Sequence, residues 1–377
     1  SSIRVAFIDG QLKRQIYGFL LECGNLSDFF TVNTKNLNMD QLPAHLHYTN
    51  QEKPGILRVK RGKNFSYEFT NGKPVLAKST LDRIDNLVIP PMWESVWITK
   101  DPKGHIQATG VDLKGRKQYI YHRHWVAYRQ NSKYQRLKFF GEALPMIRKR
   151  VSEDILLPGW PRDKMLALMV MILDEVFIRI GNISYVRENG TYGLSTLRRK
   201  HVHIEEGVVT FEYKAKSGKF RKVVLEDEEL VPLIKECFDL PGYDIFRYYD
   251  EETKCYCNVL SDDVNSYLRE ITGAEFSAKD FRTWAGSVLT VSLKEEAEKE
   301  QEATPRKKLE NILVNLVAEK LGNTPSICRS YYIHPTILEA VETKDLKEAE
   351  KIAYKKYRRL RNKLEPEEIL TLHLLDA

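Results

Sequence analysis

The chain has 377 residues and a formal net charge of +7, and 42% of its residues are hydrophobic and 29% charged. This balance is typical of a folded protein of two to three domains and excludes a mainly disordered or fibrous chain. The longest apolar run, Met165 to Leu173, is far shorter than the roughly 20 residues of a membrane span, so we expect a soluble chain without a membrane partner. Five scattered cysteines without a CxxC pair favour a reducing compartment, the cytosol or the nucleus, over a disulfide framework.

The N-terminal third beyond residue 45 carries strand patterns. Short alternating runs separated by turn residues occur at ILRVK, NFSYEF, VWITK, HIQATG and RKQYIYH, and a helical run follows at SKYQRLKFFGEALPMIRKR. The Pro/Gly sequence LLPGWPRDK ends this region. We therefore predict a mainly β domain over 46–155. Residues 1–45 show weak patterning and are expected to be an N-terminal extension of unknown role.

Helical periodicity dominates the second part of the chain, 156–342. It begins with KMLALMVMILDEVFIRIG, which predicts one buried helix that ends at Gly181. The segments HVHIEE, GVVTFEYKA and KFRKVVL then predict a three-stranded meander. Further helices are expected, including one that ends at Gly322 and one that opens at Thr324-Pro325. Residues 343–377 are predicted to form a charged helical tail, so the fold class is α+β.

The positive charge is local. Residues 101–150 hold 12 Lys or Arg and 3 Asp or Glu, a net of +9, which leaves 7 − 9 = −2 for the remainder. Tyrosine, histidine and tryptophan are interleaved with these cations, and that mixture suits phosphates together with sugars or bases. A solvated basic face is the alternative. We favour a nucleic-acid partner.

The common enzyme fingerprints for nucleotide, hydrolase and zinc-protease sites do not occur in this sequence. The alternating pairs His122/His124 and His201/His203 offer no third ligand, so they favour surface or hydrogen-bonding roles over a metal site. We expect no cofactor and no metal.

Four segments carry a family resemblance: FIRIGNISYVRENGTYGLSTLRRKHV, KAKSGK, KDFRTWAG and LGNTPSICRSYYIHP. They resemble the catalytic domain of the type IB DNA topoisomerases, in particular the short bacterial and poxvirus-type enzymes. The segment from DRIDNLVIPP to RKQYIYH resembles their N-terminal DNA-clamping domain, so the likeness spans roughly residues 53–342. It implies a DNA-clamping β domain, a mainly helical catalytic domain of the tyrosine recombinase and topoisomerase type, and relaxation of both signs of supercoil without ATP or metal.

The resemblance also implies a catalytic set. Tyr332 matches the nucleophile that forms a 3′-phosphotyrosyl bond, Arg179 and Arg282 match two catalytic arginines, and Lys216 matches the general acid. Asn323, nine residues before Tyr332, stands where histidine is frequent in the family and is expected to donate one hydrogen bond to the transition state. Lys279 stands where the related recombinases have histidine, which favours a topoisomerase.

The residue types suit this chemistry. Attack on a phosphodiester builds negative charge, which guanidinium groups can hold without titrating, and the leaving 5′ oxygen needs a proton donor such as Lys216. Alternatives remain for single residues. Arg179 could offset a helix C-terminus, Lys214 or Lys219 could replace Lys216, and Tyr331 could replace Tyr332.

The DNA contacts that the resemblance implies are Lys114, Arg116, Gln118, Tyr119 and Tyr121 in the N-terminal domain and Tyr185, Thr196 and Lys279 in the catalytic domain. Backbone contact to duplex DNA is expected from them. One chain carries the whole catalytic set, which predicts a monomer clamped on DNA, most naturally in the bacterial nucleoid, with a nuclear or viral setting left open. A tyrosine recombinase and a non-catalytic DNA-binding protein are the rival interpretations.

Overall fold

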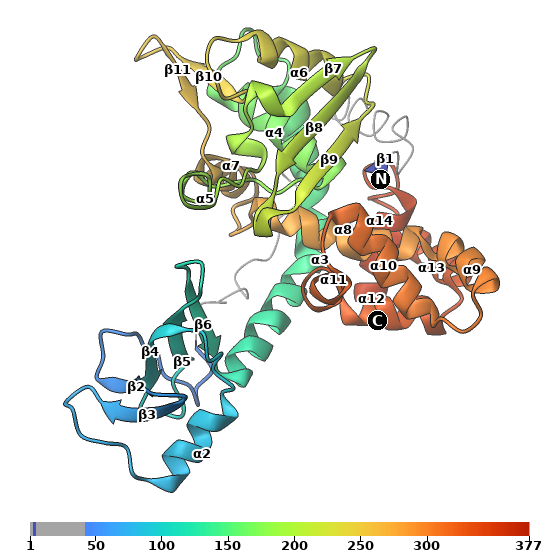
Figure 1. Cartoon of the computed structure of the whole chain (residues 1–377). Coiled ribbons are helices and arrows are strands. Elements are labelled where there is room, and N and C mark those ends of the chain that lie inside the picture. Colours follow the sequence, from blue (N-terminus) through green and yellow to red (C-terminus); the bar gives the residue numbers. More distant parts are fainter. Residues whose placement is uncertain (1–2, 5–41, 377) are drawn as a thin grey trace. The chain divides into compact units, whose positions relative to one another are not determined.

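The computed structural model describes residues 3–4 and 42–376 and divides into two compact units (Figure 1). The smaller unit is Lys35–Gln135, and the larger one combines Ser1–Thr34 with Arg136–Ala377. The division falls within helix α3 (Arg123–Asp154), earlier than the predicted limit at residue 155. The predicted domains 46–155, 156–342 and 343–377 therefore stay predictions, and most of the predicted extension 1–45 lies outside the described residues.

The smaller unit is built on an antiparallel sheet in the order β3-β2-β4-β5-β6. Its strands are β2 (Gly55–Arg61), β3 (Asn64–Phe69), β4 (Glu94–Thr99), β5 (Ile106–Val111) and β6 (Lys117–Tyr121). Ile56, Ile98 and Ala108 are fully buried in one apolar cluster, and Ile84 of helix α2 (Lys78–Asn86) joins it. All five predicted strands are present.

A second sheet lies in the larger unit, in the order β1-β9-β8-β7. Strands β7 (Val202–Glu205), β8 (Val208–Lys214) and β9 (Phe220–Leu225) form the predicted antiparallel meander. The short strand β1 (Ile3–Arg4) pairs in parallel with β9, a pairing that the sequence did not predict. The mixed α+β class is confirmed.

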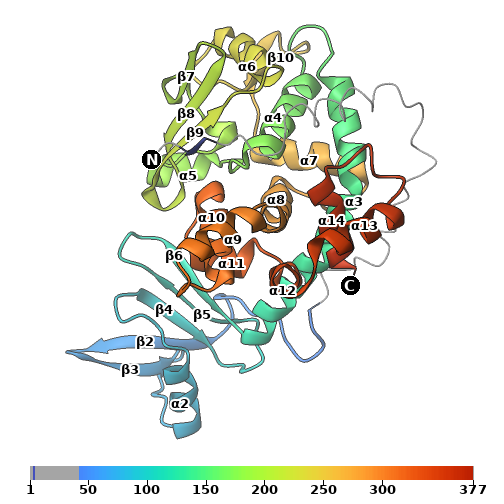
Figure 2. The same cartoon turned by 90° about the vertical axis from the view of Figure 1, so that its right-hand side faces the viewer.

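Helices make up most of the larger unit, and Figure 2 shows α8, α10, α11 and α12 gathered in one region. The helices beyond α3 are α4 (Arg162–Val176), α5 (Ile183–Asn189), α6 (Leu230–Asp239), α7 (Ser261–Thr272), α8 (Ala278–Ser292), α9 (Lys294–Ala303), α10 (Leu309–Leu321), α11 (Pro325–Tyr331), α12 (Pro335–Thr343), α13 (Leu346–Lys356) and α14 (Pro366–Leu375), and a hairpin of β10 (Arg247–Asp250) and β11 (Cys255–Asn258) lies between α6 and α7. Within the described ranges, no helix is long and apolar enough to cross a membrane.

Helix α4 is shorter than its apolar run predicts. It ends at Val176, because Phe177 adopts a left-handed conformation with φ 52° and ψ 30°, so the prediction of one helix through to Gly181 is wrong. Phenylalanine rarely adopts this conformation. Burial of its side chain in the core around α8 and α10 compensates for the strain, and the chain leaves the helix before Arg179.

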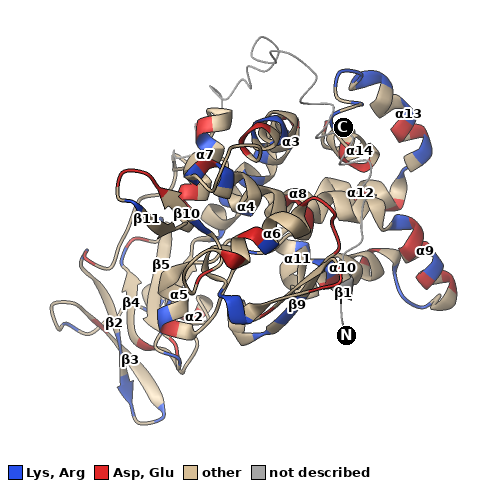
Figure 3. Ribbon diagram, turned by 90° about the horizontal axis from the view of Figure 1, so that it is seen from above, with Lys and Arg blue, Asp and Glu red and all other residues tan. Residues whose placement is uncertain are grey.

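The C-terminal region is not one charged tail. Helix α13 carries charges of both signs on its surface (Figure 3), as the pattern predicts. Helix α14 instead buries Ile369, Leu372 and Leu374 in the core of the larger unit. The amphipathic prediction therefore holds for α13, whereas α14 is a core helix.

Candidate active site

Arg179 lies in the extended segment that follows α4. Its carbonyl accepts a hydrogen bond from the Leu194 amide at 2.8 Å, and a Cβ on Gly193 would stand 2.5 Å from that carbonyl oxygen, so only glycine allows this approach. The Arg179 guanidinium donates to the side-chain oxygen of Asn323. Because α4 ends before Arg179, the alternative that this side chain merely offsets the helix C-terminus loses its basis.

Arg282 lies on α8 and is only 2% exposed. Its guanidinium donates to the carbonyl of Phe177 and, at 2.8 Å, to the carbonyl of Leu321. The same group lies 5.1 Å from the ring centroid of Tyr332. Burial comes first among the causes that hold the pKa of Arg282 below its ordinary value, and the nearby charge of Arg179 adds to it.

Asn323 directly follows the end of α10. Gly322 takes the left-handed conformation with φ +60°, as its sequence position predicts, and the Asn323 amide returns to the Ala318 carbonyl at 2.9 Å. The side-chain oxygen of Asn323 accepts from Arg179, while its Nδ2 is buried and has no hydrogen-bond partner among the described residues. That amide can therefore donate to a bound oxygen atom.

Tyr332 directly follows α11, a short helix that Thr324 caps through its side chain and Pro325 opens, as predicted. Gly286 of α8 lies against it, since a Cβ there would stand 2.4 Å from the Tyr332 carbonyl oxygen. Burial by itself raises the pKa of Tyr332. The charges of Arg282 and Arg179 and a hydrogen bond from Arg282 outweigh that effect, so the net pKa lies below 10.

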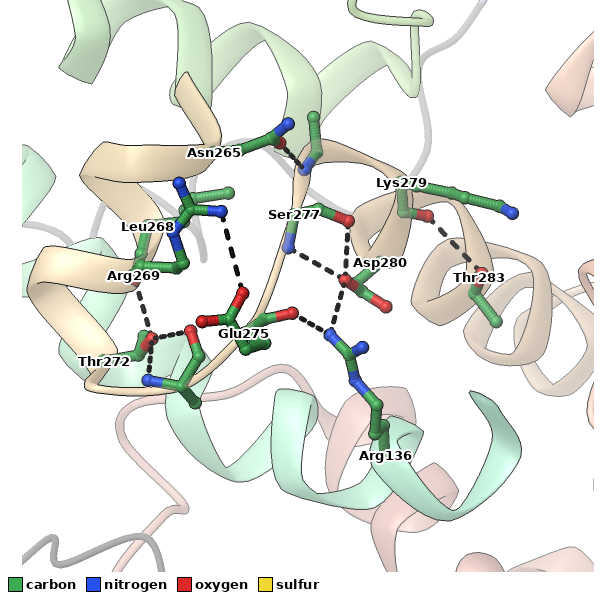
Figure 4. A network of polar contacts seen from close by, with 12 residues as sticks. Arg136, Asn265, Leu268, Arg269, Thr272, Glu275, Ser277, Lys279, Asp280 and Thr283 are labelled. Carbon is green, nitrogen blue, oxygen red and sulfur yellow. Dashed lines mark hydrogen bonds and ion pairs between the residues drawn. The ribbon is translucent and has the colours of Figure 1, made fainter. Parts of the chain in front are cut away.

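The start of α8 is held by a polar network, which Figure 4 shows. The Asp280 carboxylate accepts from the amide and hydroxyl of Ser277, each at 2.9 Å, in a reciprocal N-terminal cap. Arg136 of α3 contacts Asp280 at 3.4 Å and the Glu275 carbonyl. Lys279 lies on this first turn with an exposed side chain, and its charge contributes to the lowered pKa of Tyr332.

No hydrogen bond or ion pair joins Lys216 to Arg179, Arg282 or Asn323. It lies in the turn between β8 and β9, a single 3₁₀ turn, Lys216–Gly218, in which Ser217 and Gly218 have positive φ. Its side chain is exposed, and no described residue forms a hydrogen bond or ion pair with it. Of its two rivals, Lys214 contacts the Asn189 carbonyl at 3.4 Å. The choice of Lys216 therefore remains a prediction.

Arg221 was missed in the sequence. It lies on β9, is 7% exposed, and donates to the carbonyl of Leu321 at 2.6 Å. The signal was available, because Arg221 shares its strand parity with the buried Val223 and Leu225 and so faces the core. An arginine on the apolar face of a strand indicates a specific partner.

Arg179 thus contacts the Asn323 side chain, Arg282 lies on the Tyr332 ring, and Arg221 shares the Leu321 carbonyl with Arg282. Arg179, Arg221 and Arg282 donate to carbonyl and amide oxygens, and within residues 42–376 none of them forms an ion pair with a carboxylate. Buried charge without a counter-ion is costly. The cluster is therefore suited to bind an anion next to the phenol of Tyr332.

The two remaining predicted DNA contacts of this unit differ in exposure. Tyr185 on α5 is 54% exposed and can meet a ligand. Thr196 is 6% exposed, and its hydroxyl accepts from the Gly193 amide and donates to the Gly193 carbonyl, both at 3.0 Å. Thr196 thus braces the loop next to Arg179, and direct contact with DNA stays a prediction for both residues.

In the smaller unit, the predicted DNA-contacting residues lie on β6 and on the turn before it. Tyr119 and Tyr121 are exposed and stacked, with ring centroids 5.9 Å apart and planes 13° apart. Arg116 and Gln118 both donate to the Asp112 carboxylate, at 2.7 and 2.9 Å. Lys114 is exposed in the turn between β5 and β6. Tyr119 and Tyr121 therefore lie on the exposed face of β6, whereas Gln118 shares its strand parity with Ile120, which packs against the core.

Comparison with known proteins identifies the family. A family model for the catalytic core of eukaryotic DNA topoisomerase I matches residues 117–360, well over half of the chain. The DNA topoisomerase 1B of Acanthamoeba polyphaga mimivirus is 31% identical over 291 residues, which cover 76% of this chain and 87% of the viral protein. The chain belongs to the type IB DNA topoisomerases. The resemblance of the sequence motifs to this family is thereby confirmed.

Other matches support the same family. A model of the N-terminal domain of bacterial DNA topoisomerase IB matches residues 64–112 of this type IB topoisomerase, within the smaller unit. The DNA topoisomerase 1B of Vaccinia virus (strain Copenhagen) is 26% identical over 264 residues, covering 67% of this chain and 77% of that protein. The DNA topoisomerase I of Monkeypox virus is 25% identical over the same length.

Proposed function

We propose that this type IB topoisomerase relaxes positive and negative supercoils in duplex DNA by cutting one strand through Tyr332, allowing rotation and resealing the strand. The observation that carries this proposal is the cluster of the Arg179, Arg221 and Arg282 guanidinium groups, none paired with a described carboxylate, in which Arg282 lies directly on that tyrosine. A backbone phosphodiester is the anion that duplex DNA supplies, and its charge compensates the cluster.

In the cutting step, Tyr332 gives up its phenol proton to solvent, and the phenolate oxygen attacks the phosphorus atom and forms a 3′-phosphotyrosyl bond. The bond from phosphorus to the 5′ oxygen breaks, and that oxygen leaves with a proton. Arg179 and Arg282 hold the non-bridging oxygens as charge builds on them. The buried Nδ2 of Asn323 donates one further hydrogen bond.

Lys216 is the proposed proton donor to the leaving 5′ oxygen. Support comes from its place at the tip of the β8–β9 hairpin, because Arg221 on the same hairpin reaches the cluster. A lysine on an exposed turn can move to meet bound DNA and transfer a proton. The rival Lys214 instead contacts the Asn189 carbonyl.

Resealing reverses these steps. The phosphotyrosyl bond retains the energy of the phosphodiester, so the freed 5′ hydroxyl can attack it without nucleotide hydrolysis. The surface of β6 that carries Tyr119 and Tyr121 contacts the DNA backbone. One chain carries the full set of groups, which supports a monomer as the active form. We place it in the bacterial nucleoid, and the viral relatives make a viral genome the alternative setting.

The test is relaxation of negatively and of positively supercoiled plasmid in EDTA without ATP. We expect complete relaxation of both by the wild-type chain and none by Tyr332→Phe, with Tyr331→Phe as the matched control that keeps activity. Plasmid binding without any change in linking number would contradict the proposal and favour a non-catalytic DNA-binding protein. A requirement for two specific sites would favour a recombinase.

A further inference from the structure

We propose that Arg221 is a positioning residue for strand cleavage, which holds the β8–β9 hairpin onto the turn that carries Asn323. The inference rests on the proposed function, since it concerns the same reaction. It adds a residue that the family resemblance did not assign.

The contacts of Arg221 join two distant segments. From β9 its guanidinium donates to the Leu321 carbonyl at 2.6 Å and to the Lys320 carbonyl at 3.4 Å, at the C-terminal end of α10. The negative end of a helix favours a cation in this position. Gly322 makes room for it, because a Cβ there would stand 2.6 Å from Arg221 Nη1.

One carbonyl is shared by two arginines. Leu321 accepts from Arg221 at 2.6 Å and from Arg282 at 2.8 Å, and Asn323 follows two residues later. A displacement of this turn therefore moves the partner of Arg282 and the amide of Asn323 together. Lys216 lies five residues before Arg221 on the same hairpin, so the contact also limits where its tip can move.

The energetics point to function rather than to folding. Arg221 and Arg282 bring two like charges to one buried carbonyl, and the Nε atom of each is buried without a hydrogen-bond partner among the residues described. Two buried cations without a carboxylate partner destabilise the protein when no DNA is bound. A leucine at this position of β9 would fill the same space without the cost of burying a charge. The arginine is therefore explained by two roles, attraction of an anionic ligand and fixing of the turn that carries Asn323.

The experiment measures single-turnover cleavage of a duplex whose cut product dissociates, at saturating enzyme, together with duplex affinity and thermal unfolding. Arg221→Leu is expected to cleave about 100-fold more slowly, the magnitude typical of losing one preorganised donor, with affinity changed by less than about threefold. Arg221→Lys restores part of the rate, since it keeps the charge but not the two-pronged contact.

Two further variants keep the test decisive. Gly322→Ala pushes on the guanidinium and also strains the left-handed turn before Asn323, and it is expected to slow cleavage in the same way. Lys222→Gln is the matched control, because Lys222 lies on the opposite face of β9 and pairs with Glu212 at 2.8 Å; its rate should equal that of the wild type.

Cleavage by folded Arg221→Leu at the wild-type rate would overturn the inference. So would losses in Arg221→Leu and Arg221→Lys that are equal and follow their unfolding temperatures, since a purely structural role predicts this. Absence of cleavage by the wild-type chain would instead contradict the proposed function itself.

Discussion

At Tyr332, burial and charge act on the phenol in opposite directions. Burial raises its pKa, while Arg282, Arg179 and Lys279 lower it, and the charges prevail. The phenolate therefore forms at lower pH than it does in an exposed tyrosine. Because the proposed nucleophile acts in its deprotonated form, the cations next to Tyr332 are expected to contribute to reactivity as well as to phosphate binding.

This balance predicts the pH dependence of cleavage. The single-turnover rate should rise with pH and level off below 10, since the folded pKa of Tyr332 is lowered. Lys279→Gln removes one of the cations that lower the pKa of Tyr332 and should move the rise to higher pH. Added salt should shrink that difference, because Lys279 is exposed and its charge is screened. An unchanged profile in Lys279→Gln at low salt would contradict this account of the phenol.

Asn323 offers a second test at the residue scale. Asn323→Asp is expected to slow cleavage by about 100-fold or more, because a carboxylate next to Arg179 would occupy the guanidinium that the phosphate needs. Asn323→Ala loses only the donated hydrogen bond and should be slowed less. Single-turnover rates at saturating enzyme distinguish the two. Equal rates for both variants would argue against a competing carboxylate.

The sequence pattern placed some of these residues and missed others for physical reasons. Capping and turn residues have strong local backbone preferences, so the helix cap at Thr324 and the left-handed Gly322 could be predicted. Arg221 was missed because its partners are carbonyl groups at the end of α10, about a hundred residues away in sequence. The strand parity of Arg221 indicated that its side chain faces the core, but no local spacing identifies such distant partners. For Lys216, the sequence pattern leaves nearby lysines as alternatives, and the structure shows no contact that decides between them.

At the scale of elements, two neutral imidazole side chains accept backbone hydrogen bonds, one in a loop and one at the start of a helix. His334 accepts from the Thr336 amide at the start of α12, and His201 accepts from the Arg198 amide, each through Nδ1. Burial comes first among the causes that lower the pKa of each to about 4. Protonation would both place a charge in the interior and break these hydrogen bonds.

The sign of the stability effect follows from these values. The unfolded chain takes up protons near pH 6.5 and the folded chain only near pH 4, so stability falls as the pH drops through that window. The loss should be on the order of 2 kcal/mol for each imidazole, since one pKa unit corresponds to about 1.4 kcal/mol and both sites are partly screened.

His334→Asn can accept from the Thr336 amide without titrating. Urea unfolding at pH 7 and pH 5 should show a weaker loss in that variant, while the exposed His203→Asn keeps the wild-type loss; equal losses in all three chains would contradict the assignment.

Gly322 and Pro325 marked the end of α10 and the start of α11 correctly, whereas Gly181 did not mark the end of α4, because tertiary packing ends that helix earlier. The run through Phe177 continues the apolar periodicity of α4, so nothing local indicates that the helix ends at Val176. Burial of the Phe177 ring against other helices selects the left-handed turn. This turn determines where Arg179 lies, and it is a property of the packed protein rather than of the segment.

At the scale of the larger unit, the C-terminal helix is part of the core that supports the site. Glu368 of α14 accepts from Arg148 of α3 at 2.8 Å and from Trp284 of α8 at 3.1 Å, and Arg148 also contacts Asp174 of α4 at 2.9 Å. These side chains are almost fully buried. Helix α8, which carries Arg282, is therefore braced by a residue close to the end of the chain.

Removal of the central cation should be severe. Arg148→Met removes the guanidinium that neutralises the buried Asp174 and Glu368 carboxylates and is expected to lower the free energy of unfolding by about 3–5 kcal/mol. Arg150→Gln is the matched control on the same helix. Arg150 is half exposed and pairs with Asp154, so its loss should cost less than about 1 kcal/mol. Urea unfolding measures both, and equal effects would show that the buried network does not brace the unit.

The central claim is that Tyr332 attacks phosphorus and keeps the 3′ end of the cut strand. The most direct measurement is to trap the covalent adduct with detergent on a labelled duplex, digest the protein and locate the modified peptide by mass spectrometry. We predict one modified residue, Tyr332, joined to the 3′ phosphate, with a free 5′ hydroxyl on the other fragment. An adduct on Tyr331, a linkage to the 5′ end, or relaxation without any adduct would contradict the account.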